Sequence, residues 1–364
     1  MTQSRLAVAR RYRCSGGSSF ANRIGTEAVQ SVEPSTTSLH FFLRNHSHCT
    51  THEFRQEALF FPLGFPVRIL SNSHDILKAA EQSWNCFESL FGGPPLEVRI
   101  GVKAHGAGNG RLPPAPIHSF RGNLLLLAAD EDNFTVADLK NGRSVSWVTE
   151  ITAASTMYLR YHFLEAAALA MVSSLRAVPI HAACVQHENS GILLCGDSGA
   201  SKSSLSYGCA RAGWTFVCDD ASYIPIDRTD RLVVGNCHQV RFRPSASEIF
   251  PEIEGRAITP RAAGKPSIEI RTSEWTHLST NNSASIEHIV FLDRRKGDLR
   301  QELIPLQSAT VCPWFMRTLF PTVGSHTEQE ASIRRLLTAP VYELRYQELA
   351  WAIDRLHQLA ATGK

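Results

Sequence analysis

The residues of this chain that are best suited to chemistry lie between Gly196 and Ser203, where the sequence reads GDSGASKS. An apolar run, ILLC, precedes them and a helix-compatible segment follows, so the stretch predicts a strand, a loop and a helix in that order. This order is typical of the phosphate-binding loop, or P-loop. There, backbone N–H groups and a helix N-terminus hold an anion, a lysine reaches the outer phosphates and a hydroxyl meets Mg²⁺. We therefore predict a nucleotide site with these contact residues: Gly196, Asp197, Ser198, Gly199, Ala200, Ser201, Lys202, Ser203 and Ser204.

One position departs from the consensus G-x-x-x-x-G-K-[ST], because Ser201 stands where the second glycine is expected. A Cβ atom there crowds the approach of a phosphate and makes a positive φ costly. Gly199 still gives the loop freedom, and Ser201 could offer its hydroxyl. The alternative is an ordinary Gly/Ser-rich turn with a solvated Lys202, which the flanking strand and helix disfavour.

Two adjacent carboxylates, Asp219 and Asp220, follow at the end of a predicted buried strand, 214–218. Ligands of parallel α/β sheets bind at that edge. Successive strand side chains point to opposite faces, so we expect only one carboxylate to face the phosphates unless the strand breaks there. One could activate a hydroxyl and the other could hold Mg²⁺, directly or through water. The alternative is a solvated Asp pair in a turn.

Further candidates flank this core. His181 is predicted to lie in a strand just before the loop, where it could orient or share the proton of a carboxylate base, or be a satisfied core histidine. Arg241 and Arg243 alternate with apolar residues, so both could point the same way. Either could stabilise transferring phosphate charge, or both could be surface arginines on an edge strand.

Three segments together resemble the C-terminal catalytic domain of the HPr kinase/phosphorylase family, whose fold is related to phosphoenolpyruvate carboxykinase. They are IHAACV (180–185), GDSGASKSS (196–204) and CDDASY (218–223), and the resemblance covers residues 178–226. It implies an α/β fold with a mixed sheet flanked by helices. The chain departs from the family at Ala182, at Ser201 and at QVRFRPSASEIFPEIEG (239–255), where the family has a glutamate-rich, arginine-glycine signature.

The resemblance also implies an activity, namely ATP- and Mg²⁺-dependent transfer of the γ-phosphate to a seryl hydroxyl of a protein. It implies that His181 and Asp219 assist proton transfer, that Lys202 binds the β- and γ-phosphates, and that Ser203 with Asp220 serves Mg²⁺. We add Arg243 as a catalytic candidate. Members of the family assemble as hexamers, which leaves homo-oligomerisation open here.

Composition narrows the class of protein. The chain has 364 residues, a hydrophobic fraction of 43% and a formal net charge of only +3, which predicts globular cores and no nucleic-acid partner. Nine cysteines without a C-x-x-C pair suggest reduced thiols and a cytoplasmic location. The apolar helix expected over 157–175 is too short and too polar to span a membrane, so we expect no membrane partner.

The sequence predicts three parts: a flexible, Arg- and Ser-rich tail (1–55), a smaller N-terminal α+β domain (56–152) and the kinase-like nucleotide-binding domain (153–364). Three functions remain open. The first is a kinase acting on a hydroxyl of a protein or small molecule. The second is a nucleotide-binding regulatory module with little or no turnover, because Ser201 replaces the loop glycine. The third, carboxykinase-like metabolite phosphorylation, is weaker because the sequence shows no cationic pocket for a small carboxylate.

Overall fold

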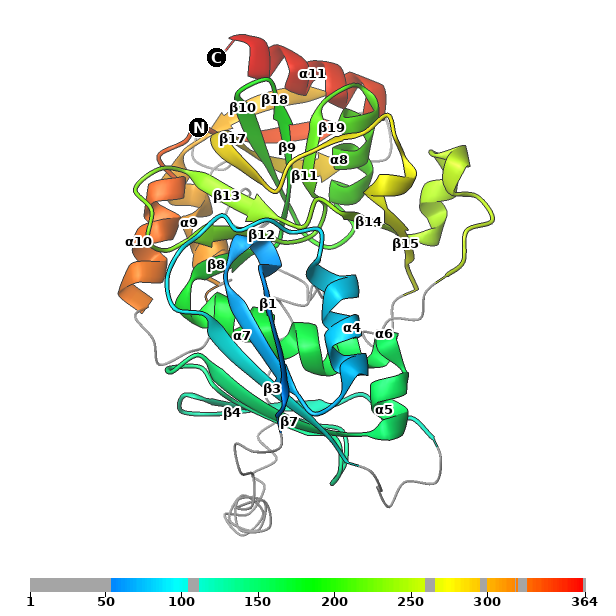
Figure 1. Ribbon diagram of the computed structural model, residues 1–364. Coiled ribbons are helices and arrows are strands. Elements are labelled where there is room, and N and C mark those ends of the chain that lie inside the picture. Colours follow the sequence, from blue (N-terminus) through cyan, green and yellow to red (C-terminus); the bar gives the residue numbers. More distant parts are fainter. Residues whose placement is uncertain are drawn as a thin grey trace. The chain divides into compact units, whose positions relative to one another are not determined.

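A computed structural model of the protein describes residues 54–103, 111–258, 266–294, 300–317, 319 and 326–362. The chain divides into two compact units, one ending at Leu175 and one running from Arg176 onward. Each contains its own mixed sheet with flanking helices, so the protein is mixed α/β (Figure 1). The predicted tail lies outside the described residues except for its last two positions.

The N-terminal unit is built on a seven-stranded sheet with the strand order β1-β2-β3-β7-β6-β5-β4. Strands β2, β3 and β7 run parallel to one another, and the remaining neighbours pair antiparallel. The strands are β1 (Gln56–Phe60), β2 (Val67–Ser71), β3 (Leu96–Lys103), β4 (Ile117–Arg121), β5 (Leu124–Ala128), β6 (Phe134–Asp138) and β7 (Arg143–Thr149). Alternate residues of β2 and β3, such as Ile69 and Val98, are fully buried, as the period of a half-buried strand requires.

The helical segments described in this unit are the 3-10 turn η1 (Pro62–Gly64), α4 (His74–Trp84), α5 (Glu150–Ala154), α6 (Thr156–Leu159), the π-helical turn η2 (Arg160–Leu164) and α7 (Glu165–Leu175). The sequence placed the boundary between domains at 152/153, whereas the compact units divide at 175/176. The two differ because the intervening helices pack on the first unit. Arg160 Nε donates to Ser83 Oγ of α4 at 2.6 Å, and Ser83 Oγ donates to Glu165 at 2.9 Å.

The C-terminal unit is built on a ten-stranded sheet with the order β16-β11-β9-β10-β17-β13-β12-β8, in which β19 pairs with β17 and β18 with β19. Its strands are β8 (Ala177–Ile180), β9 (Ala182–His187), β10 (Ser190–Cys195), β11 (Thr215–Cys218), β12 (Ser222–Pro225), β13 (Leu232–Gly235), β16 (Ser279–Thr280), β17 (Ser283–Arg294), β18 (Glu302–Leu306) and β19 (Val341–Tyr346). A separate two-stranded sheet joins β14 (Gln239–Phe242) to β15 (Ile268–Arg271).

Helices cover both faces of this larger sheet. They are α8 (Lys202–Arg211), α9 (Ser308–Met316), α10 (His326–Leu336) and α11 (Leu349–Thr362). Ile192 and Leu194 of β10 pack into one core with α8 and α11, whereas Leu193 and Cys195 pack into the other with α9 and α10 (Figure 1). The apolar run before the phosphate loop is therefore buried on both sides, which explains why it lacks alternation.

The direction of the strands decides where the loops meet. Strand β10 runs parallel to β17 and antiparallel to β9, and β9 runs antiparallel to β11. The C-terminal ends of β10, β11 and β17 and the N-terminal end of β9 therefore lie at one edge of the sheet.

Among the described residues, every helix is too short or too polar to cross a lipid bilayer.

Candidate functional site

The phosphate loop (residues 196–203) adopts the predicted strand, loop and helix order, with β10 ending at Cys195 and α8 starting at Lys202. Gly196 has φ +151° and Gly199 has φ +95°, backbone conformations that favour glycine. A Cβ atom on Gly196 would also come within 2.9 Å of Ala200 Cβ. Gly196, the first glycine of the motif, and Gly199, which the motif does not require, therefore both have a structural reason to be glycine.

Ser201 lies in the left-handed region, at φ 67° and ψ 27°, as expected for the position where the consensus has glycine. That conformation costs an L-residue about 1–2 kcal/mol. Its hydroxyl is engaged, because Arg294 Nη1 donates to Ser201 Oγ at 3.0 Å. Within the described chain no side chain caps α8. The first N–H groups of this helix have no intrahelical acceptor, and they point toward a place where an anion would be favoured.

Lys202 is buried, with only 6% of its surface exposed, so the alternative of a solvated loop lysine is wrong. Its Nζ donates to the carbonyls of Gly196 at 2.7 Å and Asp197 at 3.2 Å. It also lies 2.9 Å from His181 Nε2. Burial lowers the pKa of Lys202, and the charge of Asp220 opposes that shift. The ammonium is thus held at the loop by three acceptors in a poorly hydrated place.

The sequence predicted that His181 lies inside a strand. In the structure it lies between two strands, after the end of β8 and before the start of β9. The strand breaks there because its partners change: β8 pairs with β12, whereas β9 pairs with β10 and β11. His181 Nδ1 lies 3.1 Å from the Asp220 carbonyl and 3.4 Å from Asp220 Oδ1. Burial first, and then Lys202, lowers the pKa of His181 to about 4. A neutral imidazole that donates from Nδ1 and accepts from Lys202 satisfies all of these contacts.

Asp219 and Asp220 both line the same cavity. The expectation that only one would do so assumed that the strand continued, but β11 ends at Cys218, before the pair. Asp219 is 6% exposed, and its Oδ2 accepts the backbone N–H of Arg241 at 2.8 Å. The Asp220 side chain is 26% exposed and lies against His181. The Asp219 carboxylate is thus held by a backbone N–H group of β14, and the Asp220 carboxylate lies against the imidazole of His181.

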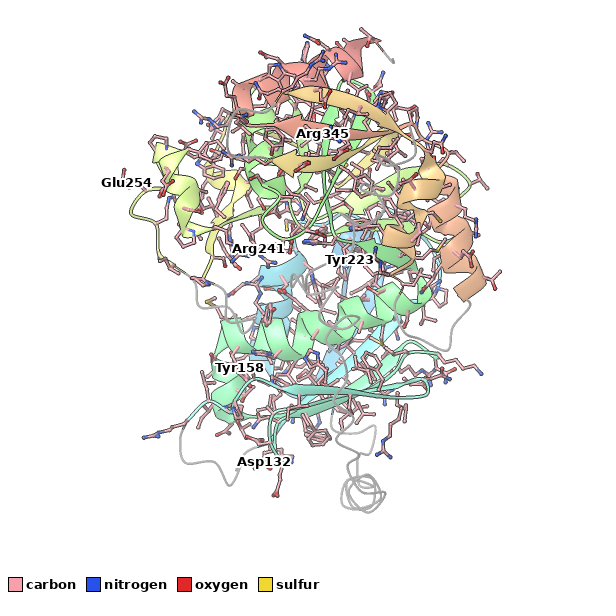
Figure 2. All side chains as sticks on the ribbon, turned by 180° about the vertical axis from the view of Figure 1, so that it is seen from behind. Asp132, Tyr158, Tyr223, Arg241, Glu254 and Arg345 are labelled. Atoms are coloured by element: carbon pink, nitrogen blue, oxygen red, sulfur yellow. The ribbon has the colours of Figure 1, made fainter. Side chains whose placement is uncertain are left out.

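Three arginines line this cavity, and two of them are those that the sequence singled out. Arg241, labelled in Figure 2, has its Nε 3.2 Å from Glu269 Oε1 on the neighbouring strand β15. Arg243 is exposed and donates from Nη2 to Ser198 Oγ at 3.4 Å. The third is Arg294, at the end of β17.

The cavity has a volume of about 270 Å³ and lies at the edge of the sheet where these strand ends meet. Four cationic side chains and two carboxylates line it: Lys202, Arg241, Arg243, Arg294, Asp219 and Asp220. The rest of its lining combines His181 and several serines with four apolar residues, Phe242, Ala246, Ile249 and Pro266. The sequence showed no cationic pocket for a small carboxylate, whereas four cationic side chains line this cavity. The missed residue is Arg294. The sequence offered one signal for Arg294, namely that DRR (293–295) directly follows the apolar run 286–292. That signal did not place Arg294 at the site, because the sequence does not show that β17 lies beside β10.

Oxygen donors for a hard cation are present in the cavity. The Ser203 hydroxyl and the Asp220 carboxylate both line it, and these are ligand types that Mg²⁺ takes alongside waters and nucleotide phosphates. Across the described ranges, no group of three or more His, Cys, Asp or Glu side chains is arranged to hold a metal ion. The donors therefore fit a cation that is shared with a phosphate ligand better than a cation held by protein alone.

No protein-family model matches this chain, and no curated protein does. Among solved structures, it is similar to the HPr(Ser) kinase/phosphatase from Coxiella burnetii, with 12% sequence identity and a TM-score of 0.27. That match covers 50% of this chain and 97% of the other. The likeness is distant, and a TM-score this low does not establish a shared fold.

Proposed function

We propose that the C-terminal unit is an ATP- and Mg²⁺-dependent kinase that transfers the γ-phosphoryl group to a serine-type hydroxyl of a protein or a small molecule. The observation that carries this proposal is the convergence of three features on one cavity. These are the phosphate loop with its uncapped α8 N-terminus, the buried ammonium of Lys202, and the pair Asp219 and Asp220.

Binding follows from the loop geometry. The N–H groups at the start of α8 and the Lys202 ammonium would take the phosphates, with Lys202 exchanging part of its present contacts for phosphate oxygens. Ser203 and Asp220 would hold Mg²⁺, which supplies charge neutralisation at the β- and γ-phosphates. Arg243, which contacts Ser198 at 3.4 Å, would stabilise the charge that develops on the transferring group.

Proton transfer is assigned to Asp219. Its carboxylate is oriented by the Arg241 N–H, so it can accept the proton of the acceptor hydroxyl without first rearranging. The hydroxyl oxygen then bonds to the γ-phosphorus while the bond from that phosphorus to the β–γ bridging oxygen breaks, and ADP leaves. His181 is better suited to positioning than to proton transfer, because its two ring nitrogens face Lys202 and Asp220.

The test is calorimetric titration of the full chain with MgATP, followed by incubation with γ-labelled ATP. Serine-containing peptides and small hydroxyl compounds serve as the two classes of acceptor. Saturable binding with transfer to either class would support the proposal and identify the acceptor class. A folded protein that binds no MgATP at millimolar concentration would overturn it.

A second candidate is a nucleotide-binding regulatory module with little or no turnover. It is favoured by Ser201, whose strained conformation places a Cβ atom where phosphate loops have glycine, and whose hydroxyl is tied to Arg294. The two candidates separate in the same experiment. Tight MgATP binding without transfer or hydrolysis would assign the regulatory module.

A further inference from the structure

We propose that Arg294 is a phosphate-binding residue of this site and that the Ser201 hydroxyl positions its guanidinium over the phosphate loop. The ligand class is the outer phosphates of a nucleoside di- or triphosphate. This inference rests on the proposed nucleotide site, and it adds a residue that neither the loop motif nor the Asp pair contains.

The position of Arg294 follows from the register of β17. Cys195, the last residue of β10, pairs with Phe291, so β17 continues past β10 through Leu292, Asp293 and Arg294. At a rise of about 3.3 Å per residue, this extension reaches roughly 10 Å along the loop. Gly196 lies against it, because a Cβ on that glycine would be 3.4 Å from the Leu292 carbonyl oxygen.

The face of the strand directs the side chain. Leu292 belongs to the buried core that also contains Leu205 of α8. Arg294 is two residues further along the strand, so it is on the same face as Leu292, the face that α8 covers. Its contact with Ser201, the N-cap residue of α8, agrees with this placement.

The electrostatics of this place call for an anion. A helix N-terminus carries a partial positive charge, and Lys202 stands at its first position. The carboxylates of Asp220, Asp197 and Asp219 act on Lys202, whereas the observed hydrogen-bond partner of the Arg294 guanidinium is the neutral hydroxyl of Ser201. A phosphate group at this point would accept charge-assisted hydrogen bonds from the helix, Lys202 and Arg294 together.

This arrangement gives Ser201 a role that glycine could not perform. The hydroxyl holds the arginine at 3.0 Å, so the strained serine is part of the phosphate site as well as a departure from the motif. A glycine there would relax the backbone but would leave the guanidinium without this contact.

The test compares the affinities of four full-length variants for MgATP, MgADP and AMP by calorimetry. They are Arg294→Gln, Arg294→Lys, Ser201→Gly and the double variant Ser201→Gly/Arg294→Gln. Arg355→Gln, which alters an arginine of α11 that contacts Gln358, is the matched control. Thermal unfolding is recorded for each.

Arg294→Gln should weaken MgATP about tenfold to a hundredfold and leave AMP within about twofold, because charge-assisted hydrogen bonds are lost only at the outer phosphates. Arg294→Lys keeps the positive charge and should keep most of the affinity for MgATP. If Arg294→Gln unfolds, the lysine variant still tests whether a cation at this position binds the outer phosphates. Ser201→Gly should weaken MgATP severalfold, with little further effect in the Arg294→Gln background.

The outcomes separate this inference from the kinase proposal. Wild-type protein that binds no MgATP would overturn both. Wild-type binding that Arg294→Gln leaves unchanged, or an equal loss for AMP and MgATP, would overturn the role of Arg294 alone. Tighter MgATP binding by Ser201→Gly would overturn the positioning role of Ser201.

Discussion

Replacing Lys202 with methionine removes the ammonium while keeping a side chain of similar length in a buried place. In the wild-type protein Nζ donates to the Gly196 and Asp197 carbonyls and to His181 Nε2, at 2.7, 3.2 and 2.9 Å. A phosphate ligand must compete with these contacts for the same donor. The affinity that Lys202 contributes is therefore the difference between two sets of charge-assisted hydrogen bonds.

The magnitude follows from that exchange. Hydrogen bonds to charged groups contribute about 1.5–3 kcal/mol each. If Nζ gains two phosphate oxygens and gives up one of its three present acceptors, the net gain is one such hydrogen bond, about 1.5–3 kcal/mol. Lys202→Met should thus weaken MgATP binding roughly 10- to 150-fold. Stability should change little, because methionine loses the three hydrogen bonds but also removes the cost of burying an ammonium, the cost that lowers the pKa of Lys202.

The assay is calorimetric titration with MgATP beside a thermal unfolding scan. Lys140→Met, which removes an exposed lysine of the N-terminal unit, serves as the control. A shift of the unfolding midpoint by no more than about 4 °C corresponds to at most about 2 kcal/mol for a domain of this size. A folded Lys202→Met protein that binds MgATP as tightly as the wild type would refute the assignment of the phosphate loop.

Three further predictions concern the same site. Asp219→Asn should keep the hydrogen bond from Arg241 N–H and bind MgATP within about threefold of wild type, yet lower phosphoryl transfer or ATP hydrolysis about 10²- to 10⁴-fold. Asp219→Ala should in addition lose about 1–3 kcal/mol of unfolding free energy in urea, because that N–H loses its acceptor. Retained turnover in the asparagine variant would exclude Asp219 as the base. The free energy of unfolding should fall as the pH decreases from about 6.5 toward 4, because the folded state keeps His181 neutral, with a pKa of about 4, while the unfolded chain takes up the proton. A His181→Gln variant with the same pH dependence would contradict that account. Gly199→Ala should cost about 1 kcal/mol or more and weaken MgATP, because φ is +95° although an added Cβ meets no atom within 4 Å. An unchanged unfolding midpoint would show that the loop relaxes freely.

The sequence was most informative where the determinants are local. The glycine spacing and the hydrophobic run before it predicted the β10, loop and α8 unit, and the structure confirms its order. The same holds for the Asp pair, which follows a short buried strand directly. Ser201 was expected to be strained if it took a positive φ, and it does take one.

The sequence was less informative where the structure around a residue depends on partners far away in the chain. His181 was assigned to a strand because its neighbours are apolar, but the strand breaks where its pairing partners change. The motif predicted a phosphate contact for Lys202, but only the structure shows that Lys202 is buried and that it contacts His181, 21 residues earlier in the chain. Residues 153–175 were assigned to the C-terminal domain, whereas they belong to the N-terminal compact unit, because the amphipathic pattern of a helix does not say which sheet it covers.

The sequence by itself determined that this chain has a strand, a glycine-containing loop and a helix with the pattern of a phosphate loop, followed by two carboxylates, because short-range spacing and backbone conformation specify both. Only the tertiary structure decided which cations join them. Arg241 reaches the cavity through a two-stranded sheet, and Arg294 reaches it through the parallel pairing of β10 with β17, across 93 positions from Ser201. Strands β10 and β17 are far apart in the sequence, and the packing of the whole sheet decides that they become neighbours.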